Sequence, residues 1–157
     1  MIKKAKKLYI SVILCLILFF SLAGCGSDNY LDEYKAKMEN FFEQLNDYDN
    51  AINSLDPYSA SAVSDLLFYL DGVADAIREM ASYDVPDVFY GVDELARQAN
   101  EYMAEAVSLY NEAFLAFEYN DNIAAAASEN YERANLRLRY IAEILRGDIP
   151  EEIFSSN

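Results

Sequence analysis

Oxygen-bearing side chains are dense in two short segments, NDYDN at 46–50 and EYNDN at 118–122. Carboxylate and amide oxygens are the ligands that calcium prefers. Neither segment has the glycine at loop position six and the glutamate at position twelve that an EF-hand requires. Asn and Asp next to helix ends usually serve as caps and turn formers. We therefore keep Asp47, Asp49 and Asp121 only as weak candidate cation ligands, and expect the acidic surface to attract cations collectively.

Catalytic groups are scarce in the rest of the chain. It contains no histidine and no tryptophan, and its two cysteines are Cys15 and Cys25. A histidine base and the Glu-x-x-His motif of di-iron bundles are therefore excluded. A carboxylate pair could act as acid and base, but nothing in the sequence selects one pair from 27 acidic residues. We predict that the protein is not an enzyme and has no cofactor.

Tyrosine is frequent, with 13 copies, and several copies fall where the chain is expected to turn. Tyrosine has an apolar ring and a polar hydroxyl, and it is enriched in binding surfaces. We take Tyr58 and Tyr119 as a candidate partner surface. The alternative is that these rings line the rim of the fold with their hydroxyls in water.

The first 24 residues have the composition of a secretion signal. Lysines crowd the first seven positions, and the segment 8–22 then contains no charged residue. Fifteen positions are short for a membrane span, which needs about 20 apolar residues, but they suit the apolar region of a signal peptide. We predict that residues 1–24 are cleaved off.

The segment Leu22-Ala23-Gly24-Cys25 at the end of this region resembles the lipobox of bacterial lipoproteins. The resemblance implies that Cys25 becomes the first residue of the mature chain and carries diacylglycerol on its sulfur. Two or more acyl chains anchor a protein stably, so the partner of Cys25 is the membrane, on the extracytoplasmic face of the cell. An uncleaved N-terminal helix or an ordinary cleaved signal remains the alternative. The body resembles the small helical lipoproteins of Gram-positive bacteria in general character, from which no activity follows.

The mature chain is strongly acidic. Removing residues 1–24 with their four lysines changes the formal net charge from −15 to −19. Nucleic-acid binding needs a basic patch, so nucleic acid is excluded as a partner. Close adhesion of the body to an anionic lipid surface is disfavoured for the same reason.

Apolar residues recur at alternating spacings of three and four throughout the body, which predicts amphipathic helices. The stripes run over 31–55, 63–80, 92–117 and 127–145. We expect the third helix to be the longest, with about thirty residues. Aromatic residues such as Phe68 are expected in the wide layers of the core, and alanines on the third and fourth stripes should let those two helices approach closely.

Capping residues mark the expected helix ends. Asp56 can cap the second helix with Pro57 at its first position, where a missing N–H costs nothing. Asn120 or Asp121 can begin the fourth helix, and Gly147 occupies the position that a C-terminal cap prefers.

Four helices with short connections predict an all-α fold, an antiparallel up-down-up-down four-helix bundle. The start of the first helix, the 83–90 connection and the C-terminus should face the membrane, and the connections near residues 56 and 120 should point away. The predicted parts are a signal peptide 1–24, a lipidated tether 25–29, the bundle 30–149 and a tail 150–157.

These features predict a lipid-anchored, extracytoplasmic binding module without catalytic activity, whose partner is an envelope protein. The alternative is a lipoprotein that binds a small ligand or a cation. Partner binding predicts an exposed aromatic patch, whereas ligand binding predicts polar groups that converge between the helices. Asn130, Asn135 and Arg137 are candidates for such groups, but the sequence does not fix which way they face.

Overall fold

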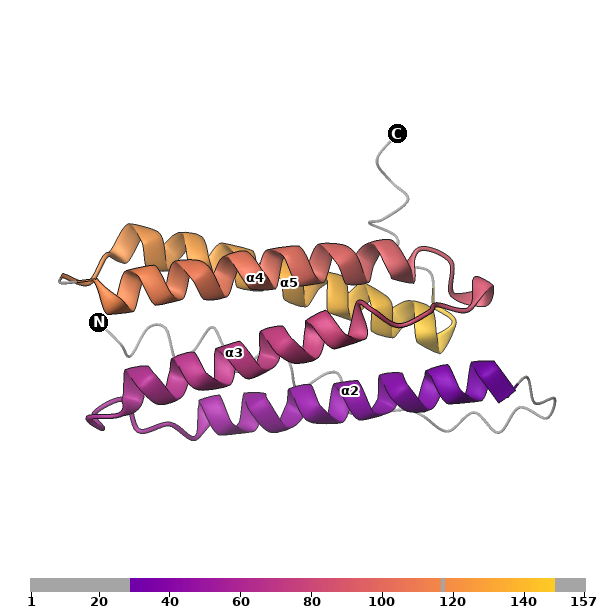
Figure 1. The fold of residues 1–157 in the computed structure, drawn as a ribbon, viewed down its shortest axis with the longest axis horizontal. Coiled ribbons are helices and arrows are strands. Elements are labelled where there is room, and N and C mark those ends of the chain that lie inside the picture. The colour runs from indigo at the N-terminus through magenta and orange to yellow at the C-terminus, as the bar shows by residue number, and fades with distance from the viewer. Residues whose placement is uncertain (1–28, 117, 149–157) are drawn as a thin grey trace.

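A computed structural model describes residues 29–116 and 118–148 of the protein (Figure 1). No strand occurs in this part of the chain, and the predicted all-α class is confirmed. The signal segment, Cys25 and the tail 150–157 lie outside the described residues. The elements are α2 (Asn29–Asn53), α3 (Ala62–Met80), the 3-10 helix η1 (Asp87–Phe89), α4 (Val92–Leu115) and α5 (Asp121–Arg146).

The two ends of α5 confirm the predicted caps. The Oδ1 atom of Asn120 accepts hydrogen bonds from the backbone N–H groups of Asn122 at 3.1 Å and Ile123 at 3.2 Å. Gly147 has a left-handed φ of 88°, and its N–H donates to the carbonyl of Ile144 at 2.9 Å. The N–H of Asp148 donates to the carbonyl of Glu143, which completes a Schellman motif.

The predicted start of the second helix at Asp56 and Pro57 is wrong. The Asp56 carboxylate accepts a hydrogen bond from the N–H of Tyr58 at 3.0 Å, and its carbonyl accepts one from the N–H of Ser59. These bonds close a local turn, a conformation for which Asp competes with helix. α3 begins five residues after Pro57, at Ala62.

Two further expectations fail. The third helix is not the longest: α4 has 24 residues and α5 has 26. α4 stops early because Ala116 adopts an extended conformation with a ψ of 156°. Phe68 does not fill the core, because the buried face of α3 contains its neighbour Leu67 and leaves 69% of Phe68 exposed. Adjacent residues on a helix point in different directions, so both cannot face inward.

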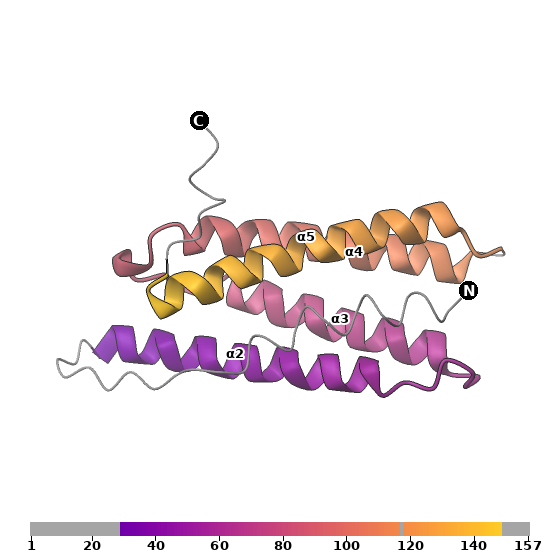
Figure 2. The same cartoon turned by 180° about the vertical axis from the view of Figure 1, so that it is seen from behind.

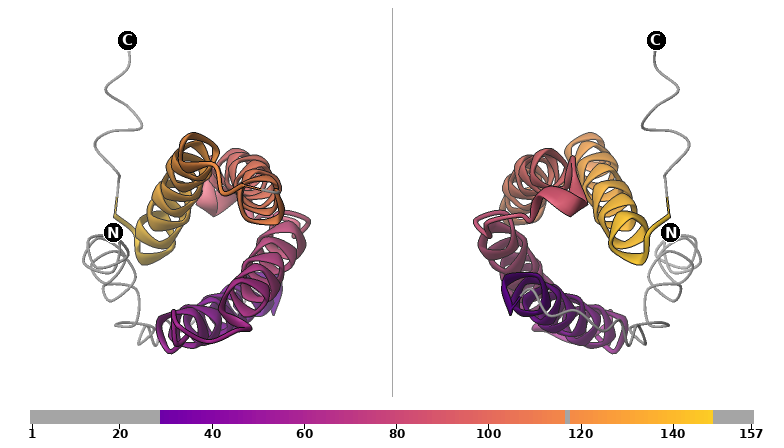
Figure 3. Two further views of the ribbon diagram at one scale, coloured as in Figure 1. Left: turned by 90° about the vertical axis from the view of Figure 1, so that its left-hand side faces the viewer. Right: turned by 90° about the vertical axis from the view of Figure 1, so that its right-hand side faces the viewer.

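The four helices lie in chain order along an arc when viewed down their length (Figure 3). Within the described residues, extensive helix contacts join α2 to α3, α3 to α4 and α4 to α5. The α4–α5 contact is the most extensive, as the alanines predicted. Both helices carry fully buried alanines: Ala99, Ala106 and Ala113 on α4, and Ala127 and Ala134 on α5.

One end of the molecule, which we call the closed end, contains a buried aromatic contact. This end holds the start of α2, the connection 81–91 and the end of α5 (Figures 1 and 2). The Tyr34 and Phe89 rings meet there at a centroid distance of 5.6 Å, and the Tyr30 hydroxyl donates to the carbonyl of Asp84 at 2.9 Å. The buried residues of α2 are Tyr34, Met38 and Phe41, all in its first half.

The opposite end holds the connections 54–61 and 116–120 (Figures 1 and 2). We call it the pocket end. Among the described helices, none is both long enough and apolar enough to cross a bilayer.

Candidate functional site

A pocket of about 400 Å³ opens at the pocket end, between the α2–α3 pair and the α4–α5 pair. All four helices contribute to its walls, and so do the two connections at this end. Pockets that hold small molecules typically span about 300–1,000 Å³ and are mostly apolar. The lining residues are Asp49, Ile52, Asn53, Leu55, Leu66, Leu70, Tyr110, Phe114, Tyr119, Ala124 and Tyr131.

Helical spacing explains why these residues converge. Asp49, Ile52 and Asn53 stand at positions i, i+3 and i+4 of α2, so they share one face of that helix. Leu66 and Leu70 form the same i, i+4 pair on α3. The last turn of α2 thus presents one carboxylate and one amide beside an aliphatic wall.

Aromatic rings line the side of the pocket that α4 supplies. Tyr110 and Phe114, also at i and i+4, stack with centroids 6.1 Å apart and an interplanar angle of 23°. Phe114 in turn contacts the ring of Tyr119 at 5.2 Å. The three rings form a continuous row along the pocket lining, from the buried Tyr110 to Tyr119, which is 54% exposed.

The pocket exists because small side chains stand where the two helix pairs diverge. The first turns of α5 read Ile123-Ala124-Ala125-Ala126-Ala127, and Ala124 lines the pocket with only a methyl group. Across the pocket, the second half of α2 has no buried residue, and its apolar side chains there, such as Ile52, are half-buried. Interiors normally reach crystal-like density, so an unfilled volume of this size is a departure from ordinary core packing.

Among the described residues, Asp49 is the only carboxylate that lines the pocket. Partial burial raises the pKa of Asp49 above its ordinary value, because desolvation disfavours the charged form. A hydrogen bond from Asn53 acts in the opposite direction, but it is the smaller effect. The pocket therefore holds one acidic group that lacks full solvation by water.

The structure brings two of the residues that the sequence suggested into one pocket and places the other three outside it. Asp49 and Tyr119 line the same pocket, although one was taken as a cation ligand and the other as a partner contact. Tyr58 lies in the 54–61 connection and is 81% exposed. Asp47 and Asp121 are exposed and outside the pocket lining. Across residues 29–116 and 118–148, no three carboxylates lie close enough to share a metal ion.

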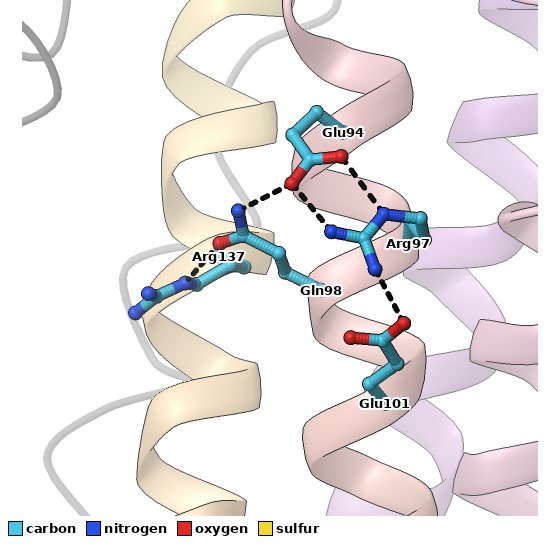
Figure 4. A network of polar contacts seen from close by, with 5 residues as sticks. All are labelled: Glu94, Arg97, Gln98, Glu101 and Arg137. Carbon is cyan, nitrogen blue, oxygen red and sulfur yellow. Dashed lines mark hydrogen bonds and ion pairs between the residues drawn. The ribbon is translucent and has the colours of Figure 1, made fainter.

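Arg137 faces the contact between α4 and α5 and not the pocket (Figure 4). Its Nε donates to Oε1 of Gln98 at 3.0 Å, and its guanidinium lies 5.0 Å from the centre of the Tyr102 ring. Asn130 donates to the carbonyl of Ala126 one turn earlier in its own helix. Asn130 and Asn135 are half-buried, and neither lines the pocket.

The same polar network continues along α4 (Figure 4). Gln98 donates to Glu94 at 2.8 Å, and Arg97 binds Glu94 through Nε at 2.8 Å and through a second guanidinium nitrogen at 2.6 Å. Arg97 also pairs with Glu101. Hydrogen bonds from Arg97 and Gln98 lower the pKa of Glu94 to about 2. Exposed pairs of this kind contribute little each, and within this network the Gln98–Arg137 hydrogen bond joins α4 to α5.

Sequence reasoning did not single out Phe114, Leu66 or Leu70 as pocket residues. Their only sequence signal was membership in or next to an apolar stripe, which is equally typical of a filled core. The available hint was the run of alanines at the start of α5. This run lies across the pocket from the end of α2, which carries both polar and apolar residues, so the space between the two helices could stay open.

No protein-family model, curated protein or solved structure matches this chain. Its function must therefore be inferred from its own residues and their arrangement.

Proposed function

We propose that this protein is a lipid-anchored, extracytoplasmic binding protein that holds a small ligand in the pocket between its two helix pairs. The observation that carries the proposal is the pocket itself, about 400 Å³ in volume, with aromatic and aliphatic walls and the polar groups of Asp49 and Asn53. The sequence left two functions open, partner binding and ligand binding. Ligand binding is the one that predicted polar groups between the helices.

The anchor in this proposal is lipid on Cys25. It is supported by the segment Leu22–Cys25 and by the uncharged run that precedes it. Cys25→Ser removes the sulfur that would carry diacylglycerol. We expect the wild-type chain to incorporate labelled palmitate in a bacterial host and to partition with membranes, and the serine variant to lose the label. Label retained by the variant would contradict the anchor.

We also propose that the helices run up-down-up-down, with the closed end toward the membrane. Short connections support this arrangement, and so does the origin of the pocket lining in the end of α2, the start of α3, the end of α4 and the start of α5. α2 begins at Asn29, four residues after Cys25. The pocket end then points away from the bilayer, where a ligand can enter from solution.

A pair of adjacent alanines provides a matched test of the pocket. Ala124 lines the pocket, and Ala125 is exposed one position later on the same helix. We expect the neutral dye N-phenyl-1-naphthylamine to bind residues 27–157 saturably with one site and increased fluorescence. Ala124→Phe should weaken this binding by about tenfold or more by filling the cavity, and Ala125→Phe should leave it unchanged.

Circular dichroism should first establish that both variants melt cooperatively. Equal weakening by the two substitutions, or no saturable binding of the dye by the wild-type domain, would contradict the pocket as a ligand site.

A second candidate function, capture of an envelope protein, is favoured by one observation at the same end. Tyr58, Leu115 and Tyr119 are apolar or aromatic and are at least half exposed. A photo-crosslinking residue at position 58 on intact cells should give one defined adduct, whereas the same residue at the exposed Ser108 should give none. The same pattern of adducts from both positions would count against a specific partner surface.

A further inference from the structure

We infer that the ligand of the pocket is a small organic amine, a single positive charge on an apolar body, held by the carboxylate of Asp49. This inference rests on the proposed function and names the chemical class that the pocket selects. Four features of the pocket carry it: the charge of its lining, the state of Asp49, the number of acidic groups and the nature of the walls.

The charge of the lining is −1. Of the lining residues that the structure describes, Asp49 is the only carboxylate, and none is a lysine or an arginine. An anionic ligand would be repelled by this carboxylate, whereas a cation would pair with it. The formal net charge of −15 for the chain adds a field that raises the local concentration of cations.

Asp49 gains from a cationic ligand because of its surroundings. Its carboxylate is half-buried, and desolvation raises its pKa. An ammonium group bound beside it would restore the favourable interactions that the carboxylate has lost by leaving water. A charge-assisted hydrogen bond in such a site is shorter and stronger than a neutral one.

The number of acidic groups argues for an organic cation and against a metal ion. Calcium takes six to eight oxygen ligands, usually with several carboxylates. The described side chains of the lining supply one carboxylate, the Asn53 amide and three tyrosine hydroxyls, and the other lining side chains are hydrocarbon. In the described part of the chain no group of three acidic residues forms elsewhere either.

The walls suit an amine with an apolar body. Ile52, Leu66 and Leu70 offer aliphatic contact, and the row of Tyr110, Phe114 and Tyr119 offers ring faces. Aromatic faces attract cations, most strongly where water is excluded. The ligand thus buries its apolar part in the interior, with its charge near the last turn of α2.

Three ligands of matched size test the inference: 4-phenylbutylamine, 4-phenylbutan-1-ol and 4-phenylbutyrate. The amine is protonated at pH 7, as lysine is. The lipidated full chain is inserted into zwitterionic phosphatidylcholine nanodiscs and titrated by calorimetry, with heats from empty nanodiscs subtracted. We expect the amine to bind about tenfold or more tightly than the alcohol, and the alcohol more tightly than the carboxylate.

Two substitutions on α2 distinguish the effect of the Asp49 charge from the effect of the overall negative charge of the protein. Asp49→Asn keeps the shape of the side chain and removes its charge, and Asp47→Asn makes the same change at an exposed position outside the pocket lining. The preference for the amine over the alcohol should vanish in Asp49→Asn and persist in Asp47→Asn.

Equal affinity of the wild-type chain for amine and alcohol would overturn the inference and leave the pocket as a site for neutral ligands. A preference for the amine that both variants lose equally would also overturn it, because bulk charge would then be the cause. If neither ligand binds and the neutral dye also fails to bind, the proposed function itself is wrong.

Discussion

The ring of Tyr48 lies directly over Gly72, so that α2 and α3 touch through a side chain on one helix and bare backbone on the other. A Cβ atom on Gly72 would stand 2.6 Å from Cε1 and Cζ of the tyrosine and 2.8 Å from its hydroxyl oxygen. Real Cβ contacts are not this short, so any side chain at position 72 must displace the ring.

Gly72→Ala tests this contact. The substitution gains about 1 kcal/mol of helix propensity but overpacks the interface by about 1–3 kcal/mol, so we expect no gain or a net loss of stability. In a Tyr48→Ala background the overpacking is absent, and Gly72→Ala should stabilise by about 1 kcal/mol. Urea unfolding of the four proteins of this double-mutant cycle measures the coupling. Additive effects within about 0.5 kcal/mol would contradict the close approach.

Asn120 caps α5, so its loss should destabilise the fold. Asn120→Ala leaves the N–H groups of Asn122 and Ile123 without their side-chain acceptor and should cost about 1 kcal/mol. Asn120→Asp should retain stability because a carboxylate also caps. Asn122→Ala, two residues later, is the control and should not destabilise. Chemical unfolding of the three variants decides the point, and equal losses at positions 120 and 122 would exclude a capping role.

The close contact between α4 and α5 depends on alanine. Ala106 is fully buried, so Ala106→Leu should overpack the interface and destabilise by about 1–3 kcal/mol. Ala104 is exposed on the same helix, and leucine and alanine have similar helix propensities. Ala104→Leu should therefore leave the unfolding midpoint nearly unchanged. An Ala106→Leu variant as stable as the wild type would show that the two helices are farther apart than described.

Asp49 and Glu94 should give opposite dependences of stability on pH. The pKa of Asp49 is raised in the folded state from an ordinary value of 3.8, so the folded protein binds this proton more tightly than the unfolded chain. The contribution of Asp49 to the free energy of unfolding therefore falls as the pH rises through the pKa that this group has in the folded protein. Asp49→Asn should thus stabilise the protein at pH 7, and the difference should shrink below about pH 4.

Glu94 has a folded pKa of about 2, below its ordinary value of 4.5. The contribution of Glu94 to stability is fully present at pH values above its ordinary pKa and is lost as the pH falls toward 2. Glu94→Gln should lower stability slightly at pH 7 and less at pH 2, where Glu94 is protonated in the unfolded chain and about half protonated in the folded protein. Thermal unfolding at pH 2, 4 and 7 compares the two variants. The same sign of effect at pH 7 for both would contradict the opposed pKa shifts.

The sequence by itself determined the local structure. Stripes with spacings of three and four placed four helices. The sequence also narrowed the cap of α5 to Asn120 or Asp121 and identified Gly147, because a cap involves only residues within one turn of the chain. The start of α3 was misplaced for an equally local reason: the turn at Asp56 and a helix cap use the same side-chain acceptor, and sequence alone does not rank them.

Only the tertiary structure decided where the helix pairs diverge and what they enclose. The pocket brings Asp49 of α2 together with Tyr119, 70 residues later in the chain, and it places Arg137 against Gln98 and not in that pocket. Which residues meet in this way depends on the volumes of side chains from all four helices at once. The periodicity of one helix shows which face turns inward, but not whether the opposing residues are large enough to fill the space.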